Sequence, residues 1–175
     1  MDEPEDPDVA KSLTAQLDIA TDLVTAYSLV TDESYVNDVA TATGGTDVTV
    51  SVTPTHGGGA DVVSSRTLPA DVPSYAKAMI GETIALTETR EFGPAAADGS
   101  RTGTITVAFA GAPVVITGTL RLSAGGGGTL VAVEMTIKAA VPFVGGKIEE
   151  MAKEQTVRYL GKEQELGRRW LKGER

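Results

Sequence analysis

The sequence predicts an α+β fold in which a curved, seven-stranded antiparallel sheet wraps around a long C-terminal helix. Three observations lead to this prediction. Seven segments alternate apolar and polar residues, as strands with one buried face do. Short loops rich in Gly join most of these segments, which favours antiparallel neighbours. The last segment, Val144 to Lys172, has a helical period and is the only element large enough to cover a sheet.

The N-terminal part predicts one strand followed by two short helices. Apolar residues from Leu13 to Ile19 alternate with polar ones, which indicates a strand with one buried face. Thr21 or Asp22 can cap a first helix, because a short oxygen-bearing side chain accepts from the free N–H groups of the first turn. A second helix is expected from Glu33 to about Ala40.

Six further strands are expected before the long helix. Their turns read THGGGAD, PAAADGS, AGAP and AGGGG, and glycines of this kind are typical of hairpin tips. One or two helical turns are expected at about residues 74–80. The six strands are expected at about residues 46–54, 60–68, 83–92, 102–110, 113–123 and 128–140.

Charge and composition exclude several classes of function. The net charge is −9, and five of the acids lie in MDEPEDPD, so residues 1–10 are expected to form a disordered acidic tail before a single domain at 11–175. An acidic domain is a poor partner for nucleic acid. The chain has no cysteine and no apolar run of the roughly 20 residues that span a membrane. It also lacks an apolar signal segment, so a cytoplasmic location is expected, with an unknown oligomeric state.

The C-terminal helix is expected to turn one stripe of residues toward the sheet. Charges spaced to pair, such as Glu149 with Lys153 and Glu154 with Arg158, are expected on its opposite face. The inner stripe comprises Ile148, Met151, Gln155, Tyr159, Leu166 and Trp170, with Ala152 beside it.

The stretch GGK at residues 145–147 raises the question of a phosphate site. A P-loop needs an earlier glycine, where this chain has Val141, and a hydroxyl after the lysine, where it has Ile148. The motif fails at both ends. A strand-to-helix corner at Pro142 is favoured, and an anion held near Lys147 at the helix N-terminus is a minor alternative.

Charged residues on apolar strand faces are the most informative signal. Glu88 and Arg90 share the apolar face of one predicted strand, and Arg66 lies on that of the strand before it. Buried charges are costly unless paired or hydrated. Two interpretations stay open: a structural ion-pair cluster, or a wet cavity in which an arginine holds the polar end of an amphipathic ligand.

The remaining predicted ligand-binding residues would line the same space. Gln155 and Tyr159 are polar groups on the inner stripe of the helix. The single histidine, His56, lies in a hairpin tip, and no set of metal ligands or catalytic residues is evident, so neither a metal nor a cofactor is expected. The apolar lining is predicted to include Leu86, Val107, Phe109, Met135 and Met151.

The order of elements, together with residues 141–170, resembles the helix-grip fold of the START and polyketide-cyclase (SRPBCC) superfamily. A closer resemblance is to an actinobacterial domain family of unknown function. It covers about residues 11–172 and implies a fold that grips a small apolar molecule between sheet and helix. It rests on RTLP at 66–69, EFGP at 91–94, DGSRTGT at 98–104 and VPFVGGKIEE at 141–150.

Three functions follow from these patterns as expectations. The first is a non-catalytic binding or carrier domain for a lipid- or polyketide-like amphipathic molecule. The second is a cyclase- or hydratase-type enzyme with Glu88 as acid or base and Arg90 or Tyr159 polarising a carbonyl. The third is a structural or interaction protein with a closed core. The space between sheet and helix should discriminate among them.

Overall fold

The computed structural model describes residues 10–175 and confirms the predicted α+β fold. The predicted acidic tail falls almost wholly on residues 1–9, outside the described residues. A short 3-10 turn, His56–Gly58, joins the strands Thr46–Pro54 and Ala60–Pro69. The elements are β1 (Lys11–Ile19), α1 (Leu23–Val30), α2 (Glu33–Ala42), β2 (Thr46–Pro54), β3 (Ala60–Pro69), α3 (Ser74–Ile80), β4 (Thr83–Phe92), β5 (Arg101–Phe109), β6 (Val114–Gly125), β7 (Gly128–Ala139) and α4 (Gly145–Leu171).

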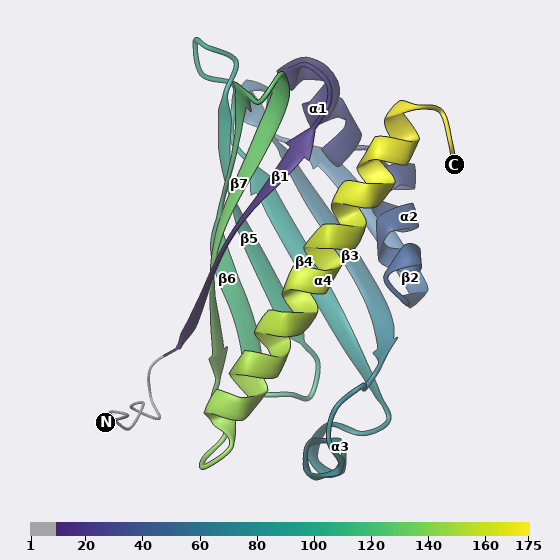
Figure 1. The fold of residues 1–175 in the computed structure, drawn as a ribbon, viewed down its shortest axis with the longest axis vertical. Coiled ribbons are helices and arrows are strands. Elements are labelled where there is room, and N and C mark those ends of the chain that lie inside the picture. The colour runs from purple at the N-terminus through teal and green to yellow at the C-terminus, as the bar shows by residue number, and fades with distance from the viewer. Residues whose placement is uncertain (1–9) are drawn as a thin grey trace.

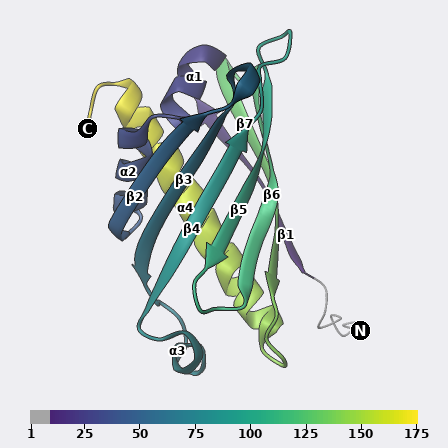
Figure 2. The same cartoon turned by 180° about the vertical axis from the view of Figure 1, so that it is seen from behind.

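The seven strands form one antiparallel sheet in the order β1-β7-β6-β5-β4-β3-β2. Strands β2 to β7 pair in chain order, with α3 in the connection between β3 and β4, and β1 joins the far edge by pairing with β7. The sheet curves around α4, which crosses it diagonally (Figure 1). Seen from behind, the outer face of the sheet carries no helix (Figure 2). The concave face is therefore the one that α4 covers.

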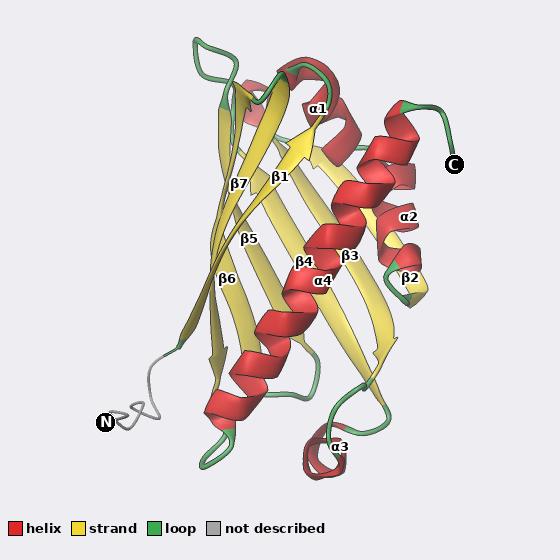
Figure 3. Cartoon of the chain, in the orientation of Figure 1, coloured by secondary structure: helices red, strands yellow, loops and turns green. Residues whose placement is uncertain are grey.

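The core lies between this concave face and the helices. Helices α1 and α2 lie at one end of the sheet and contribute Val30 and Val36 to the same apolar cluster as Leu160 of α4 (Figure 3). Their N-caps are Asp22, one of the two predicted candidates, and Asp32, and both carboxylates accept from backbone N–H groups of the first turn. Helix α4 packs closely on β1 and β7.

The inner face of α4 differs from the predicted stripe. Gln155 is exposed and Met151 only half-buried, whereas Glu149 and Glu163 are buried. Other predicted members do pack against the core, namely Ala152, Tyr159, Leu166 and Trp170. The apolar pattern gave no sign of two carboxylates on the buried face, because glutamates in a helix are usually exposed. The predicted outer pair of Glu149 with Lys153 is therefore wrong. That of Glu154 with Arg158 is confirmed, with 3.8 Å between nitrogen and oxygen.

The corner between β7 and α4 explains the buried Glu149 and the glycine pair. The Glu149 carboxylate accepts from the Ala139 backbone N–H at 2.8 Å, so it satisfies the last donor of the strand. A Cβ at Gly145 would lie 2.8 Å from the Ala139 carbonyl oxygen, whereas a Cβ at Gly146 would meet nothing within 4 Å. The first glycine thus permits a close backbone approach, as a strand-to-helix corner requires.

These two glycines give a matched pair of variants. We expect Gly145→Ala to lower the free energy of unfolding by about 1–3 kcal/mol, because the new methyl group would clash with backbone. Gly146→Ala should leave it unchanged or raise it by up to about 1 kcal/mol, because alanine favours the helix. Urea denaturation monitored by circular dichroism measures both. Equal effects of the two substitutions would contradict this account of the corner.

Candidate functional site

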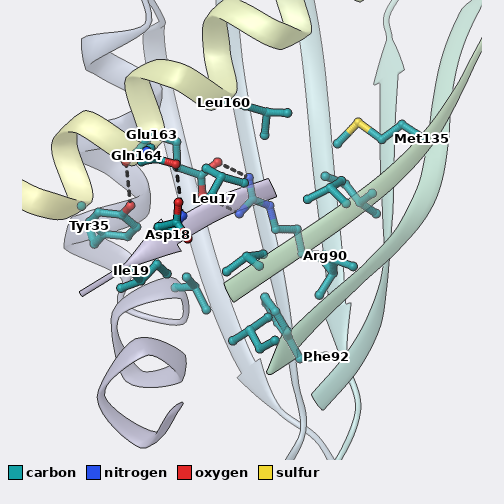
Figure 4. Close-up of a pocket in the computed structure, with 17 residues that line it drawn as sticks. Leu17, Asp18, Ile19, Tyr35, Arg90, Phe92, Met135, Leu160, Glu163 and Gln164 are labelled. Carbon is teal, nitrogen blue, oxygen red and sulfur yellow. Dashed lines mark hydrogen bonds and ion pairs between the residues drawn. The ribbon is translucent and has the colours of Figure 1, made fainter. Parts of the chain in front are cut away.

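Four charged side chains meet between the sheet and α4. Arg66 of β3 and Arg90 of β4 flank Glu88 of β4, with Arg66 Nη2 at 3.3 Å from Glu88 Oε2 and Arg90 Nε at 2.7 Å from Glu88 Oε1. From the helix, Glu163 accepts two hydrogen bonds from Arg90, at 2.7 and 2.9 Å. Figure 4 shows Arg90 reaching from the sheet to Glu163. We call these four residues the ion-pair cluster.

The ion-pair cluster is well buried and has a net charge of zero. Burial alone would raise the pKa of the Glu88 carboxyl, but the guanidinium groups of Arg90 and Arg66 outweigh it, so its pKa is lowered. Burial opposes the charge on Arg90 as well, yet Glu163 and Glu88 raise its pKa well above the ordinary value. Glu88 and Arg90 therefore stay ionised near neutral pH. The exposed fractions of the side chains are 3% for Arg66, 8% for Glu88, 14% for Arg90 and 9% for Glu163.

Two tyrosines and a serine complete the surroundings of the ion-pair cluster. The Arg66 guanidinium carbon lies 4.9 Å from the ring centroid of Tyr159, and Arg66 Nη1 donates to Ser64 Oγ at 3.2 Å. The Tyr35 hydroxyl donates to the backbone carbonyl of Glu163 at 3.2 Å. Burial raises the pKa of both tyrosines, with a further contribution from the nearby glutamates, so their hydroxyls remain protonated.

Within residues 10–175, Arg66 Nε is the buried side-chain nitrogen or oxygen that lacks a hydrogen-bond partner. Such a donor is costly to leave unpaired. The two arginines therefore offer more N–H groups than the protein's own acceptors use.

A small cavity adjoins the ion-pair cluster. Its volume is about 30 Å³, and its polar lining residues are Arg90, Glu163, Asp18, Tyr35 and Gln164. A second space of about 10 Å³ touches Ser64, Glu88 and Tyr159. Volumes of this size hold a water molecule or two and are too small for a lipid-sized ligand. The larger cavity is otherwise mostly apolar, with Leu17, Phe92, Leu122, Met135 and Leu160 among its lining residues.

The structure brings together most, but not all, of the residues predicted as a ligand site. Met135 lines the larger cavity, and Tyr159 contacts the charged groups. Leu86 and Phe109 pair across β4 and β5, and Val107 pairs with Glu88 in the same ladder, so these three belong to the core around it. Gln155 and Met151 lie apart from it, as described above. Whether any of them contacts a ligand stays a prediction.

Glu163 is the residue that the sequence reasoning missed. It follows Tyr159 by four positions, so it lies on the same side of the helix. This spacing is the sequence signal that marks Glu163 as a possible partner for the two inward-facing arginines. It was overlooked because a glutamate in a helix rich in charged residues is usually solvated.

The geometry weighs against the acid–base role considered for Glu88. A general base needs a free lone pair within reach of the substrate proton and a pKa matched to the task. Both oxygens of Glu88 accept from arginines, and its pKa is lowered instead of raised. The pairing that stabilises the charge therefore makes Glu88 a weak base.

Acid should weaken the ion-pair cluster. Because the pKa of Glu88 is lower in the folded state than in an unfolded chain, where it is about 4.3, its contribution is present above that pH and is lost as the pH falls below it. We expect the thermal midpoint of the wild type to fall between about pH 5 and 3 more steeply than that of Glu88→Gln. Differential scanning calorimetry measures both, with the exposed Glu154→Gln as control. Parallel curves for the wild type and Glu88→Gln would contradict the expected role.

The described part of the chain carries neither a metal-ligand cluster nor a membrane-spanning helix. Residues 10–175 contain no group of three or more His, Cys, Asp or Glu side chains placed to hold a metal ion. None of their helices is long and apolar enough to cross a membrane.

Comparison with solved structures shows the helix-grip fold. The protein TTHA0849 from Thermus thermophilus has a TM-score of 0.62 at 14% identity, covering 94% of this chain and 100% of that one. Human STARD10 has a TM-score of 0.64 at 8% identity, covering 96% and 67%. The ZhuI aromatase/cyclase from Streptomyces sp. R1128 has a TM-score of 0.59 at 12% identity, covering 90% and 91%. At these identities the likeness shows the fold alone.

None of the curated proteins matches the sequence. A family model described as "Protein of unknown function (DUF2505)" matches residues 14–171, which is most of the chain. This match spans the elements from β1 to the end of α4, including every member of the ion-pair cluster. The chain therefore belongs to the DUF2505 family, with a helix-grip fold shared by START domains and polyketide aromatase/cyclases.

Proposed function

We propose that this chain is a non-catalytic binding domain for a small amphipathic molecule, held between the concave face of the sheet and α4. The observation that carries the proposal is the ion-pair cluster at the wall of an apolar cavity. A ligand site typically joins a mostly apolar lining to a few polar groups that orient the ligand. The aliphatic part would lie among residues such as Leu122 and Leu160, with the polar end toward Arg90.

Energetic considerations support a role beyond stability for the ion-pair cluster. Well-packed apolar residues of similar volume stabilise a core as well as a buried ion pair does, or better. Two arginines and two glutamates in a core are therefore poorly explained by stability alone. Recognition of a polar group offers a reason for placing them beside an apolar cavity.

The present conformation is closed, so binding must enlarge the interior. The cavity of about 30 Å³ cannot hold an aliphatic chain. Helix α4 packs closely on β1 and β7, while its contact with β4 includes the Arg90–Glu163 pair. We propose that α4 shifts away from the sheet on the β4 side when ligand enters. The closed core is also the observation that favours the alternative, a structural or interaction protein without a ligand.

Binding can be tested with decanoate and decanol, which have the same chain length and differ in the polar end. We expect one molecule per protein by native mass spectrometry and a higher thermal midpoint with the ligand present. Leu160→Trp, which fills the cavity, should abolish binding. Val157→Trp, on the exposed side of α4, should preserve it. If neither decanoate nor decanol binds the wild-type protein, the closed-core alternative is favoured.

The location and the other partners remain predictions from composition. We propose that the protein acts in the cytoplasm with a small-molecule partner and without nucleic acid. Its acidic balance of 24 Asp and Glu against 15 Lys and Arg supports the latter point.

A further inference from the structure

The contact between Arg90 and Glu163 has the geometry of a bound carboxylate ligand. Two parallel N–H groups of Arg90 donate to the two oxygens of Glu163, at 2.7 and 2.9 Å. A free carboxylate would bind a guanidinium in the same fork arrangement. The protein's own side chain therefore occupies the best anion-binding position in the interior.

This pair also lies where a ligand's polar end would be. Arg90 and Glu163 both line the larger cavity, beside apolar residues such as Leu122, and both also line the smaller space. An aliphatic chain placed in the larger cavity would thus end at Arg90. Glu163 belongs to α4, the element that must shift for the cavity to grow, whereas Arg90 belongs to the sheet.

A second arginine adds unused donor capacity. Arg66 Nε is buried and has no partner, and its Nη2 contact with Glu88 is long, at 3.3 Å. If every donor in the ion-pair cluster were satisfied, Arg66 would have no unpartnered N–H group and no long contact. The interior therefore has a hydrogen-bond donor that none of its own acceptors satisfies, and an oxygen of a ligand would supply the missing acceptor.

We propose that Glu163 is a built-in substitute for the ligand's head group, and that a molecule with a carboxylate binds by taking its place on Arg90. This inference rests on the proposed function and specifies its ligand as an anionic amphiphile. The exchange conserves charge in the interior, since one carboxylate replaces another and the released Glu163 moves toward solvent with α4. Because the Arg90–Glu163 pair joins sheet to helix, its exchange also releases the helix and couples head-group recognition to opening.

The experiment compares decanoate and decanol by isothermal titration calorimetry on the wild type and on Glu163→Gln. The variant removes the competing charge, so its dissociation constant for decanoate should be at least roughly ten-fold lower than that of the wild type. Its affinity for decanol should change far less. Glu165→Gln, which alters an exposed glutamate paired with Lys162 on the same helix, should match the wild type for both compounds.

A second variant tests the same inference in case Glu163→Gln does not fold. Glu163→Asp keeps the charge but shortens the side chain, which loosens the fork, and should tighten decanoate binding by a smaller factor. If both compounds bind the wild type and neither variant favours decanoate selectively, the inference is overturned and the proposed function stands. If neither compound binds the wild type or either variant, the proposed function is wrong, and so is this inference.

Discussion

Replacing Arg90 with methionine is expected to lower the free energy of unfolding by about 3–5 kcal/mol, because it leaves two buried carboxylates without a shared partner. Arg90 contacts Glu88 at 2.7 Å and Glu163 at 2.7 Å, and its side chain is only 14% exposed. A water molecule carries no charge, so it cannot replace the guanidinium as the partner of two carboxylates. Urea denaturation at neutral pH measures the change. Arg158→Met, at an exposed arginine on α4, should change the value by less than about 0.5 kcal/mol.

Removing the whole ion-pair cluster should have the opposite outcome from removing one member. When all four charges are replaced by apolar residues of similar volume, the core loses its desolvation cost, and stability should be unchanged or higher by about 1–4 kcal/mol. That variant should still fold but lose its preference for decanoate over decanol. A large loss of stability in it would show that the charges are structurally required, and would weaken the proposed function. The substitutions are Arg66→Met, Glu88→Leu, Arg90→Met and Glu163→Leu.

Phe92→Ala is expected to lower the free energy of unfolding by about 3–5 kcal/mol, because it removes a buried ring and leaves a cavity. Phe92 is 3% exposed, lines the larger cavity and packs edge-to-face on Tyr27, with ring centroids 5.7 Å apart. The lost ring would enlarge the space beside Arg90. Urea denaturation again gives the change.

The same variant should gain binding capacity. An apolar cavity of ring size stays dry and accepts small aromatic molecules, so benzene should raise the thermal midpoint of Phe92→Ala and not that of the wild type. Phe143→Ala makes the same chemical change at a fully exposed side chain and should alter neither stability nor benzene binding. A wild-type response to benzene as large as that of Phe92→Ala would show that the interior is already open.

Much of the fold could be predicted because its signals are local. Each strand alternates over a few residues, each turn has its own glycines, and Asp22 caps the helix that follows it. The strand-to-helix corner predicted from Pro142 and the glycine pair is the one that the structure builds with Gly145 and Glu149. Neither inference needed knowledge of which distant segments meet.

The candidate site could be predicted only in part. Arg66, Glu88 and Arg90 were found because a period of two shows which face of a strand a residue occupies. Glu163 was missed and Gln155 was misplaced, since both depend on how α4 is rotated about its axis. A helix with charged residues on every side does not reveal that rotation. A stripe shifted by one residue along the sequence looks equally suitable as the buried face.

By itself, then, the sequence determined the order of elements, the antiparallel sheet and the presence of three charges on its concave face. Only the tertiary structure decided that these three charges are neutralised within the core, with Glu163 as the fourth member of the cluster. The reason is physical: alternation is set within one strand, whereas the Arg90–Glu163 pair joins residues 73 positions apart. Its formation requires the sheet to curve and the helix to pack before either side chain can lose its water.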